Sequence, residues 1–249
     1  MLSPKQEAEL IVDALFEDYG TGGFVERPCP YIDGKEAILE MKENNFPGWG
    51  EVEWGGYYIK YLVQKISKER ITGGIEPYDL GKRHLVKGNY VWDTRLFASE
   101  RGYDVILGDL EEYGAIVREN GGIGILVVDA VANRDLEESF KTWHERIKGG
   151  SSDYSIEREI EGRPSRIRKT AYMIVKVFAY YITPDDLKEG VTAGWLDTKF
   201  QRNMRNAGGS PRKPKYRLKA GSVPPGKRLF VKNFNADAEE FAEEYPEYA

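Results

Sequence analysis

The apolar run from Ile123 to Val131 is the feature of this sequence that most constrains its fold. Ile, Leu or Val stands at most of its positions, and Asp129 is its only charged residue. A strand with one face in water alternates apolar and polar side chains, whereas a strand covered on both faces is apolar nearly throughout. The run therefore predicts a buried central strand.

Helices and further strands are expected on both sides of this run. Apolar residues at helical spacing predict helices at about 4–18, 35–43, 53–67 and 110–117. Strands are expected at Leu85–Trp92 and Tyr103–Leu107, with Gly88 and Asn89 as turn or bulge residues. The two periodicities together indicate an α/β protein.

The second half of the chain is less regular. Asp135 is placed to cap a helix that ends near Lys148, and residues 149–168 have the composition of a loop or a small excursion. Thr170–Ile182 is apolar and aromatic, so it fits a strand or a buried helix equally well. Without an internal repeat or a low-complexity linker, we expect one domain over 1–249. Its N-terminal helical segment covers about 1–45, and its basic C-terminal part covers about 199–232.

Of the side chains that bind metal ions, the sequence has many carboxylates but few thiols and imidazoles. The single Cys29 and the two histidines, His84 and His144, exclude a disulfide framework, a cysteine-ligated zinc site and a histidine-rich metal site. Carboxylates remain, and they favour a hard divalent cation. No apolar run approaches the roughly 20 residues that span a bilayer, and acidic residues interrupt the apolar stretch at the N-terminus. We therefore expect no membrane segment, no signal peptide and a cytoplasmic location.

Charge is strongly segregated along the chain, although the net charge is only -5. Between residues 199 and 232 every charged residue is basic, and between 237 and 249 every charged residue is acidic. Segregation of this kind produces a local positive field that the net charge conceals. The basic part is therefore a candidate surface for nucleic acid, with a solvated basic loop as the alternative.

Two acids and one arginine form the candidate catalytic group. Asp79 precedes the expected strand pair, and Asp93 stands near the end of an apolar strand. Because side chains alternate along a strand, Asp93 and Arg95 share one face, and a hairpin between the acids would bring Asp79 beside Asp93. Carboxylates on adjacent strands can hold Mg²⁺ for phosphodiester hydrolysis, and a nearby cation can stabilise the phosphate oxygens. A surface salt bridge at a strand end is the alternative.

Pro77-Tyr78-Asp79 and Asp93-Thr94-Arg95 resemble the two halves of the PD-(D/E)XK nuclease motif. Several further stretches resemble a group of type II restriction endonucleases: 143–152, 163–170, 201–206 and 210–216. The resemblance covers about residues 45–217. It implies a restriction-endonuclease-like α/β fold, in which helices flank a mixed central sheet.

The function implied by this resemblance is sequence-specific cleavage of double-stranded DNA, with Mg²⁺ or alternatively Mn²⁺ as cofactor. Glu53 occupies the place of a helix acid that often completes the metal site of the superfamily. Glu53, Asp79 and Asp93 would then bind the metal, and Arg95 would be the cation on the phosphate side. A homodimer is expected, because two-fold symmetry is the simplest way to cut both strands of a palindrome.

The sequence departs from the motif at two positions. Tyr78 separates Pro77 from Asp79, and Arg95 stands where lysine is usual. Arginine keeps the charge but does not release a proton, so we expect it to orient phosphate rather than act as a base. The same departure favours one alternative, a non-catalytic nucleic-acid-binding protein with a degenerate nuclease fold. A nuclease without sequence specificity, acting in repair, is the other.

Two basic segments are expected to contact DNA. The first contains Arg146, Lys148, Arg163, Arg166, Arg168 and Lys169. The second contains Gln201, Arg202, Asn203, Arg205, Asn206, Arg212, Lys213 and Lys215. Arginine pairs bidentately with guanine, and asparagine or glutamine pairs with adenine, so the second segment suits base reading as well as phosphate binding. For each residue alone, a solvent-exposed charge is the alternative.

Three tyrosines and one histidine have a structural and a functional interpretation. Tyr57, Tyr58 and Tyr61 lie at helical spacing, which favours a place in the core over stacking on single-stranded nucleic acid. His144 is expected to be hydrogen-bonded or to contact phosphate, with a proton shuttle as the alternative.

Overall fold

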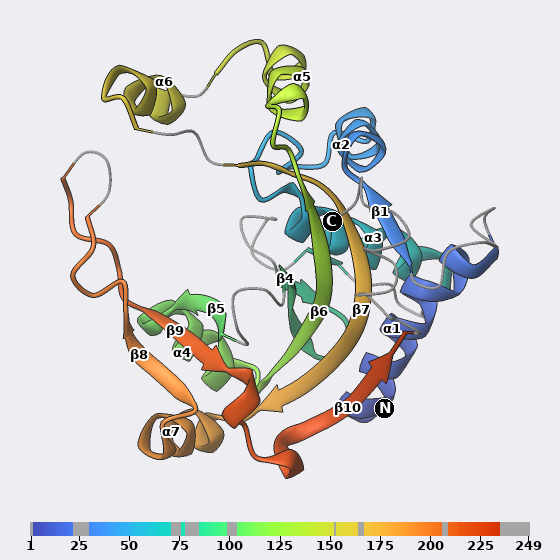
Figure 1. The fold of residues 1–249 in the computed structure, drawn as a ribbon. Coiled ribbons are helices and arrows are strands. Elements are labelled where there is room, and N and C mark those ends of the chain that lie inside the picture. The colour runs from blue at the N-terminus through green and yellow to red at the C-terminus, as the bar shows by residue number, and fades with distance from the viewer. Residues whose placement is uncertain are drawn as a thin grey trace.

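The computed structural model describes residues 2–21, 30–70, 76–77, 85–98, 104–151, 153–163, 167–205 and 209–234. These residues form a mixed α/β fold (Figure 1). Its α-helices are α1 (Pro4–Thr21), α2 (Gly34–Glu43), α3 (Trp54–Arg70), α4 (Leu110–Glu119), α5 (Ser139–Lys148), α6 (Asp153–Ile160) and α7 (Pro184–Ala193). None of the described helices is long and apolar enough to cross a membrane.

A mixed sheet of seven strands forms the centre of the molecule, in the order β1-β7-β6-β4-β3-β2, with β10 also paired to β7. Its strands are β1 (Tyr31–Asp33), β2 (Glu76–Pro77), β3 (Leu85–Lys87), β4 (Val91–Ala98), β6 (Ile123–Arg134), β7 (Lys169–Ile182) and β10 (Arg228–Asn233). The strand β6 is parallel to β4 and antiparallel to β7. The predicted central strand is therefore confirmed, since β6 has a long neighbour on each side.

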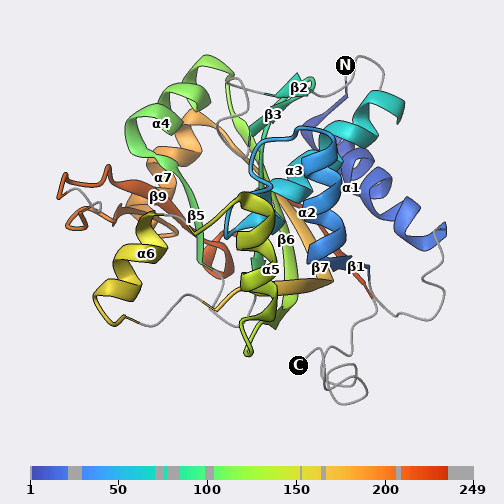
Figure 2. The ribbon, with the colours of Figure 1, turned by 90° about the horizontal axis from the view of Figure 1, so that it is seen from above.

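Two different layers cover the two faces of this sheet. Helices α1, α2 and α3 lie on one face (Figure 2). On the other face lie α4, α7 and a small antiparallel sheet in the order β5-β9-β8, whose strands are β5 (Asp104–Asp109), β8 (Leu196–Phe200) and β9 (Lys215–Lys219). Leu126 and Val128 pack against the first layer, and Ile125 and Val127 pack against the second. This double covering explains why the run in β6 lacks polar alternation.

Several element predictions are confirmed. Helices α2, α3 and α4 form where the apolar spacing predicts them, and Thr170–Ile182 is the strand β7. Leu85–Trp92 forms β3 and the start of β4, and a bend at Gly88–Tyr90 separates them where Gly88 and Asn89 were expected as turn or bulge residues. The excursion within residues 149–168 contains the short helix α6.

A buried carboxylate fastens the turn before β4 to the first helix. Glu7 of α1 is 0% exposed. It accepts hydrogen bonds from the backbone N–H groups of Asn89 and Tyr90 at 3.0 and 3.1 Å, from the Asn89 amide at 2.6 Å and from the Trp92 indole at 2.8 Å. Four donors satisfy the oxygens of this buried acid, which would otherwise be costly to desolvate. The turn, and with it the start of β4, is held in place.

Candidate functional site

The strand β4 brings Asp93 and Arg95 together, as predicted. Arg95 Nε lies 2.7 Å from Asp93 Oδ1, and its terminal nitrogen donates to Oδ2 at 2.9 Å. A two-point pairing of this kind fixes both planar groups. Asp93 is the third residue of an eight-residue strand and not its end, so the expected position near the end of a strand is wrong.

Burial dominates the electrostatics of this pair. Asp93 is 0% exposed, and desolvation raises the pKa of its carboxyl group, although the positive charge of Arg95 opposes the shift. Lys60 of α3 is 1% exposed and adds a second positive charge that acts to lower the pKa of Asp93. Across from the pair, burial and the charge of Asp93 raise the pKa of the Tyr113 hydroxyl on α4 well above its usual range.

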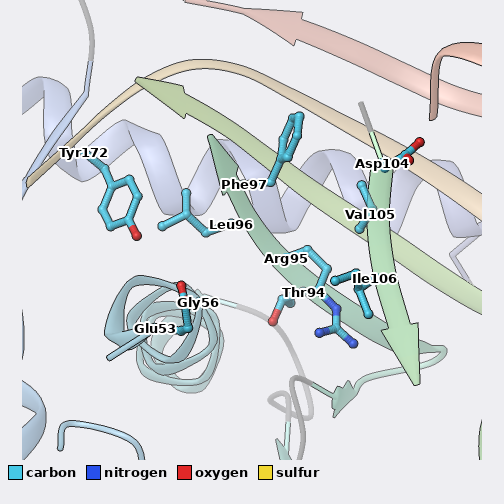
Figure 3. Close-up of a pocket in the computed structure, with 10 residues that line it drawn as sticks. All are labelled: Glu53, Gly56, Thr94, Arg95, Leu96, Phe97, Asp104, Val105, Ile106 and Tyr172. Atoms are coloured by element: carbon cyan, nitrogen blue, oxygen red, sulfur yellow. The ribbon is translucent and has the colours of Figure 1, made fainter. Parts of the chain in front are cut away.

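A pocket of about 270 Å³ opens beside β4. Helix α3 lies on one side of it and β5 on the other, with β4 between them (Figure 3). Its lining residues are Glu53, Gly56, Thr94, Arg95, Leu96, Phe97, Asp104, Val105, Ile106 and Tyr172. Glu53, immediately before α3, and Arg95 on β4 were both predicted as catalytic, and the fold places them around one cavity.

Carboxylates in this pocket have the chemistry that a hard cation prefers. Glu53 has a side chain that is 67% exposed and lies 3.8 Å from Lys169 Nζ, and Asp104 lines the opposite wall. In the part of the chain that the structure describes, no three metal-binding side chains come together. Asp79 lies outside the described residues, so the predicted metal set of Glu53, Asp79 and Asp93 stays a prediction.

The predicted DNA-contacting residues of the second segment lie on a projecting arm, which we define as residues 201–214 between β8 and β9. The arm extends beyond the small sheet, and in both views it lies on the same side of the molecule as α6 (Figures 1 and 2). Arg202, Asn203, Arg205 and Lys213 are exposed, and Gln201 and Arg212 are half-buried. Asn206 lies outside the described residues.

The root of the arm differs from the arm itself, because its cations are paired with acids. On β9, Lys215 Nζ lies 3.7 Å from Asp109, and Arg217 contacts Asp104 at 3.2 Å and Asp197 at 2.7 Å. No ion pair joins the four cations of the arm to a carboxylate among the described residues. The positive charge that is available to a ligand therefore lies beyond the root.

The first predicted DNA-contacting segment, residues 146–169, is largely neutralised. Arg163 pairs with Glu161, Lys169 lies near Glu53 as above, and Arg168 pairs with Glu145 at 3.4 Å. Arg168 is also only 6% exposed, so its guanidinium belongs to the interior. Arg146 is exposed and Lys148 half-buried, without an ion pair in the described part of the chain. Arg166 lies outside it.

The remaining candidates have structural roles. Tyr58 and Tyr61 are 7% exposed, and their hydroxyl groups donate to Glu40 at 2.7 and 3.1 Å, which confirms their place in the core. The imidazole Nε2 of His144 is 2.9 Å from the Trp49 carbonyl oxygen, so the histidine is hydrogen-bonded as expected.

Sequence reasoning missed three residues near the site. Lys60 and Tyr113 face Asp93, and Asp104 lines the pocket and pairs with the arm root. Lys60 stands within a mainly apolar helix, where a single charged residue is only a weak sign of a functional role. Asp104 and Tyr113 carry no sequence pattern that separates them from ordinary surface or core residues.

No protein family, no curated protein and no solved structure matches the chain.

Proposed function

We propose that this protein is a divalent-metal-dependent endonuclease that cleaves double-stranded DNA at specific sequences. The observation that carries the proposal is the pocket beside β4, which both Glu53 and Arg95 line although 41 residues separate them in the chain. Asp93 is paired with Arg95 but is buried and does not itself line the pocket. An acid can help to hold a metal ion and a guanidinium can stabilise charge on a phosphate, so both groups suit phosphodiester hydrolysis.

The link between the pocket and the arm supports DNA as substrate. The strand β5 forms one wall of the pocket and pairs with β9, the strand that follows the arm. Ile106 of the pocket wall is opposite Arg217, and Asp104 is opposite Lys219. A duplex held by the arm would therefore lie close to the pocket, because the two sites share one small sheet.

The roles of the residues follow from their chemistry. Arg95 would orient the scissile phosphate and stabilise its developing charge, since a guanidinium does not act as a base near neutral pH. Glu53, Asp79 and Asp93 are the acids proposed to hold the metal. When bound there, Mg²⁺ supplies an activated water and part of the charge neutralisation, and Mn²⁺ is expected to replace it. Lys60 acts to lower the pKa of Asp93, although burial raises that pKa.

The fold and assembly belong to the same proposal. A mixed sheet flanked on both faces agrees with the restriction-endonuclease-like architecture that the motif resemblance implies. Sequence-specific cutting of both strands is simplest for a homodimer, and a cytoplasmic protein would meet its DNA directly.

A non-catalytic DNA-binding protein is the second candidate. One observation favours it: Asp93 is fully buried, and both of its oxygens face Arg95. The pair of Asp93 and Arg95 is then a structural ion pair, unless the site rearranges when substrate binds. The arm would keep its DNA-binding role in that protein.

Plasmid cleavage separates these functions. Supercoiled plasmid incubated with the protein and Mg²⁺ or Mn²⁺ should be converted to linear DNA, and EDTA should prevent the conversion. Discrete fragments from genomic DNA are expected of a sequence-specific enzyme, whereas a smear indicates a nuclease without specificity. Intact plasmid with either metal, together with retained DNA binding, would overturn the nuclease proposal in favour of the second candidate.

A further inference from the structure

A buried tyrosine in the pocket beside β4 has a hydroxyl group without an internal partner. Tyr172 of β7 is 3% exposed, and its hydroxyl makes no hydrogen bond within the part of the chain that the structure describes. By contrast, the Tyr58 hydroxyl donates to Glu40 at 2.7 Å, and the Tyr180 hydroxyl donates to the Ala220 carbonyl oxygen at 3.1 Å. A buried tyrosine hydroxyl normally has a partner, so we expect the partner of this one in the pocket that it lines.

The ring of Tyr172 is held by contacts on several sides. The Trp54 ring meets it edge-on at a centroid distance of 5.1 Å, and Lys169 Nζ lies 5.6 Å from its centroid. The Trp54 indole also donates to the Lys169 carbonyl oxygen at 3.0 Å, which fastens the start of α3 to β7. At Gly55, a Cβ atom would clash with the Tyr172 ring and with Leu96, so only glycine allows this close approach. The position of the hydroxyl is therefore well fixed.

The hydroxyl end of Tyr172 points toward the side of the pocket where Glu53 and Gly56 lie (Figure 3). Burial and the charge of Glu53 raise the pKa of the hydroxyl well above its usual range, so it keeps its proton at neutral pH. Arg95 lines the same pocket from β4. A hydroxyl donor and a guanidinium, from two different strands, therefore face one cavity of about 270 Å³.

We infer that the Tyr172 hydroxyl donates a hydrogen bond to a non-bridging phosphate oxygen of the DNA strand that enters the pocket, together with the Arg95 guanidinium. This inference rests on the proposed DNA substrate and adds a substrate-contacting residue to it. A phosphodiester has two non-bridging oxygens, so donors from two elements can bind one phosphate. Tyrosine hydroxyls are among the usual donors to DNA phosphates. A donor fixed in advance also stabilises the negative charge that develops during hydrolysis.

Tyr172→Phe and Tyr180→Phe form a matched pair of variants. Both tyrosines belong to β7 and are at most 3% exposed, and each substitution removes only a hydroxyl group. Tyr180→Phe leaves the Ala220 carbonyl oxygen without its donor, so it should lower the midpoint of urea unfolding. Tyr172→Phe breaks no internal hydrogen bond, so its midpoint should equal or exceed that of the native protein.

Cleavage of plasmid should respond in the opposite order. At saturating Mg²⁺, Tyr172→Phe should cut about ten- to a hundredfold more slowly than the native protein, because a donor to the reacting phosphate is lost. Tyr180→Phe should cut at the native rate. The Mg²⁺ concentration that gives half of the maximal rate should stay unchanged in Tyr172→Phe, since the hydroxyl contacts phosphate and not a metal-binding acid.

Duplex binding without cleavage separates this inference from the nuclease proposal. The full-length native protein and both variants are titrated with a short DNA duplex in EDTA. Tyr172→Phe should bind about three- to tenfold more weakly, and Tyr180→Phe should bind like the native protein. If the native protein does not cleave but this difference in binding is found, the nuclease proposal fails and the phosphate contact stands.

Three results would overturn the inference. The first is a Tyr172→Phe protein that binds duplex as tightly as the native protein and shows no loss of cleavage relative to it. The second is an equal loss of binding or cleavage in Tyr172→Phe and Tyr180→Phe, which would indicate a general effect of repacking β7. The third is a raised Mg²⁺ requirement with a native rate at saturating Mg²⁺, which would make the hydroxyl a partner of Glu53 instead of phosphate.

Discussion

The arm and the 146–169 segment contain similar sets of basic residues, but their surroundings differ. In the 146–169 segment Arg163, Arg168 and Lys169 each lie beside a glutamate, and Arg168 is buried. In the arm Arg202, Arg205 and Lys213 are exposed and Arg212 is half-buried, and none of the four has an ion pair to a described carboxylate. A count of basic residues therefore does not measure the positive charge that a ligand can reach, because nearby acids neutralise part of that charge.

The largest expected effect concerns stability. Arg168→Ala should lower the free energy of unfolding by on the order of 3 kcal/mol, because it leaves Glu145 partly buried without its cation. Arg205→Ala on the arm should change it by less than about 0.5 kcal/mol. Urea unfolding of the two variants measures the difference. Equal losses would contradict the contrast between an interior and a surface arginine.

The next effect concerns DNA affinity. Lys213→Ala should weaken binding to all duplexes and reduce the slope of log affinity against log salt by about one, because an exposed cation is lost. Lys215→Ala should change the slope less, because Asp109 already lies 3.7 Å from this lysine. A salt series for both variants provides the measurement. An equal change in slope for the two variants would show that Asp109 does not neutralise the charge of Lys215.

A smaller effect tests whether the 146–169 segment can be made to resemble the arm. Glu161→Gln removes the partner of Arg163 and should raise DNA affinity about two- to threefold by releasing one cation. Asp185→Asn is the matched control, because it removes an exposed partner of Lys188 on α7. If both variants bind DNA equally, the gain reflects net charge alone and Arg163 lies away from the duplex.

The smallest expected effect is a pH dependence of stability within α5. Burial lowers the pKa of His144 below its ordinary 6.5, helped by Lys148 and Arg168 and opposed by Glu145 and the Trp49 carbonyl. The unfolded chain then binds more protons, so this contribution is present above pH 6.5 and is lost as the pH falls below it. Urea midpoints at pH 7.5 and 5.5 should differ more for the native protein than for His144→Gln. An identical difference would contradict the assignment.

The sequence predicts the parts of the fold that depend on local periodicity. Helices α2, α3 and α4 and the strand β6 follow from apolar spacing, because one helical face or both strand faces must be covered. The short edge strands β1 and β10 do not, since their pairing with β7 depends on contacts distant in sequence. Helix α7 was missed despite a start signal, because Thr183 and Asp186 form a capping box and Pro184 stands in the first turn.

The candidate site was predictable to a similar extent. The pairing of Asp93 with Arg95 follows from alternation along one strand, and the structure has it. The burial of Asp93 does not follow from the sequence, because Tyr113 and Lys60 come from two other elements. Asp109 lies near Lys215 although 105 residues separate them in the chain, so no local pattern could identify which cations of this basic part are neutralised.

Comparing cleavage and binding for Asp93→Asn and the native protein tests the central claim most directly. The asparagine keeps the size of the side chain but removes the charge proposed to hold the metal. With Mg²⁺, we expect the variant to lose cleavage by about a hundredfold or more while duplex binding stays equal or becomes tighter. Cleavage at the native rate by a folded Asp93→Asn protein would contradict the assignment of the active site to the pocket beside β4.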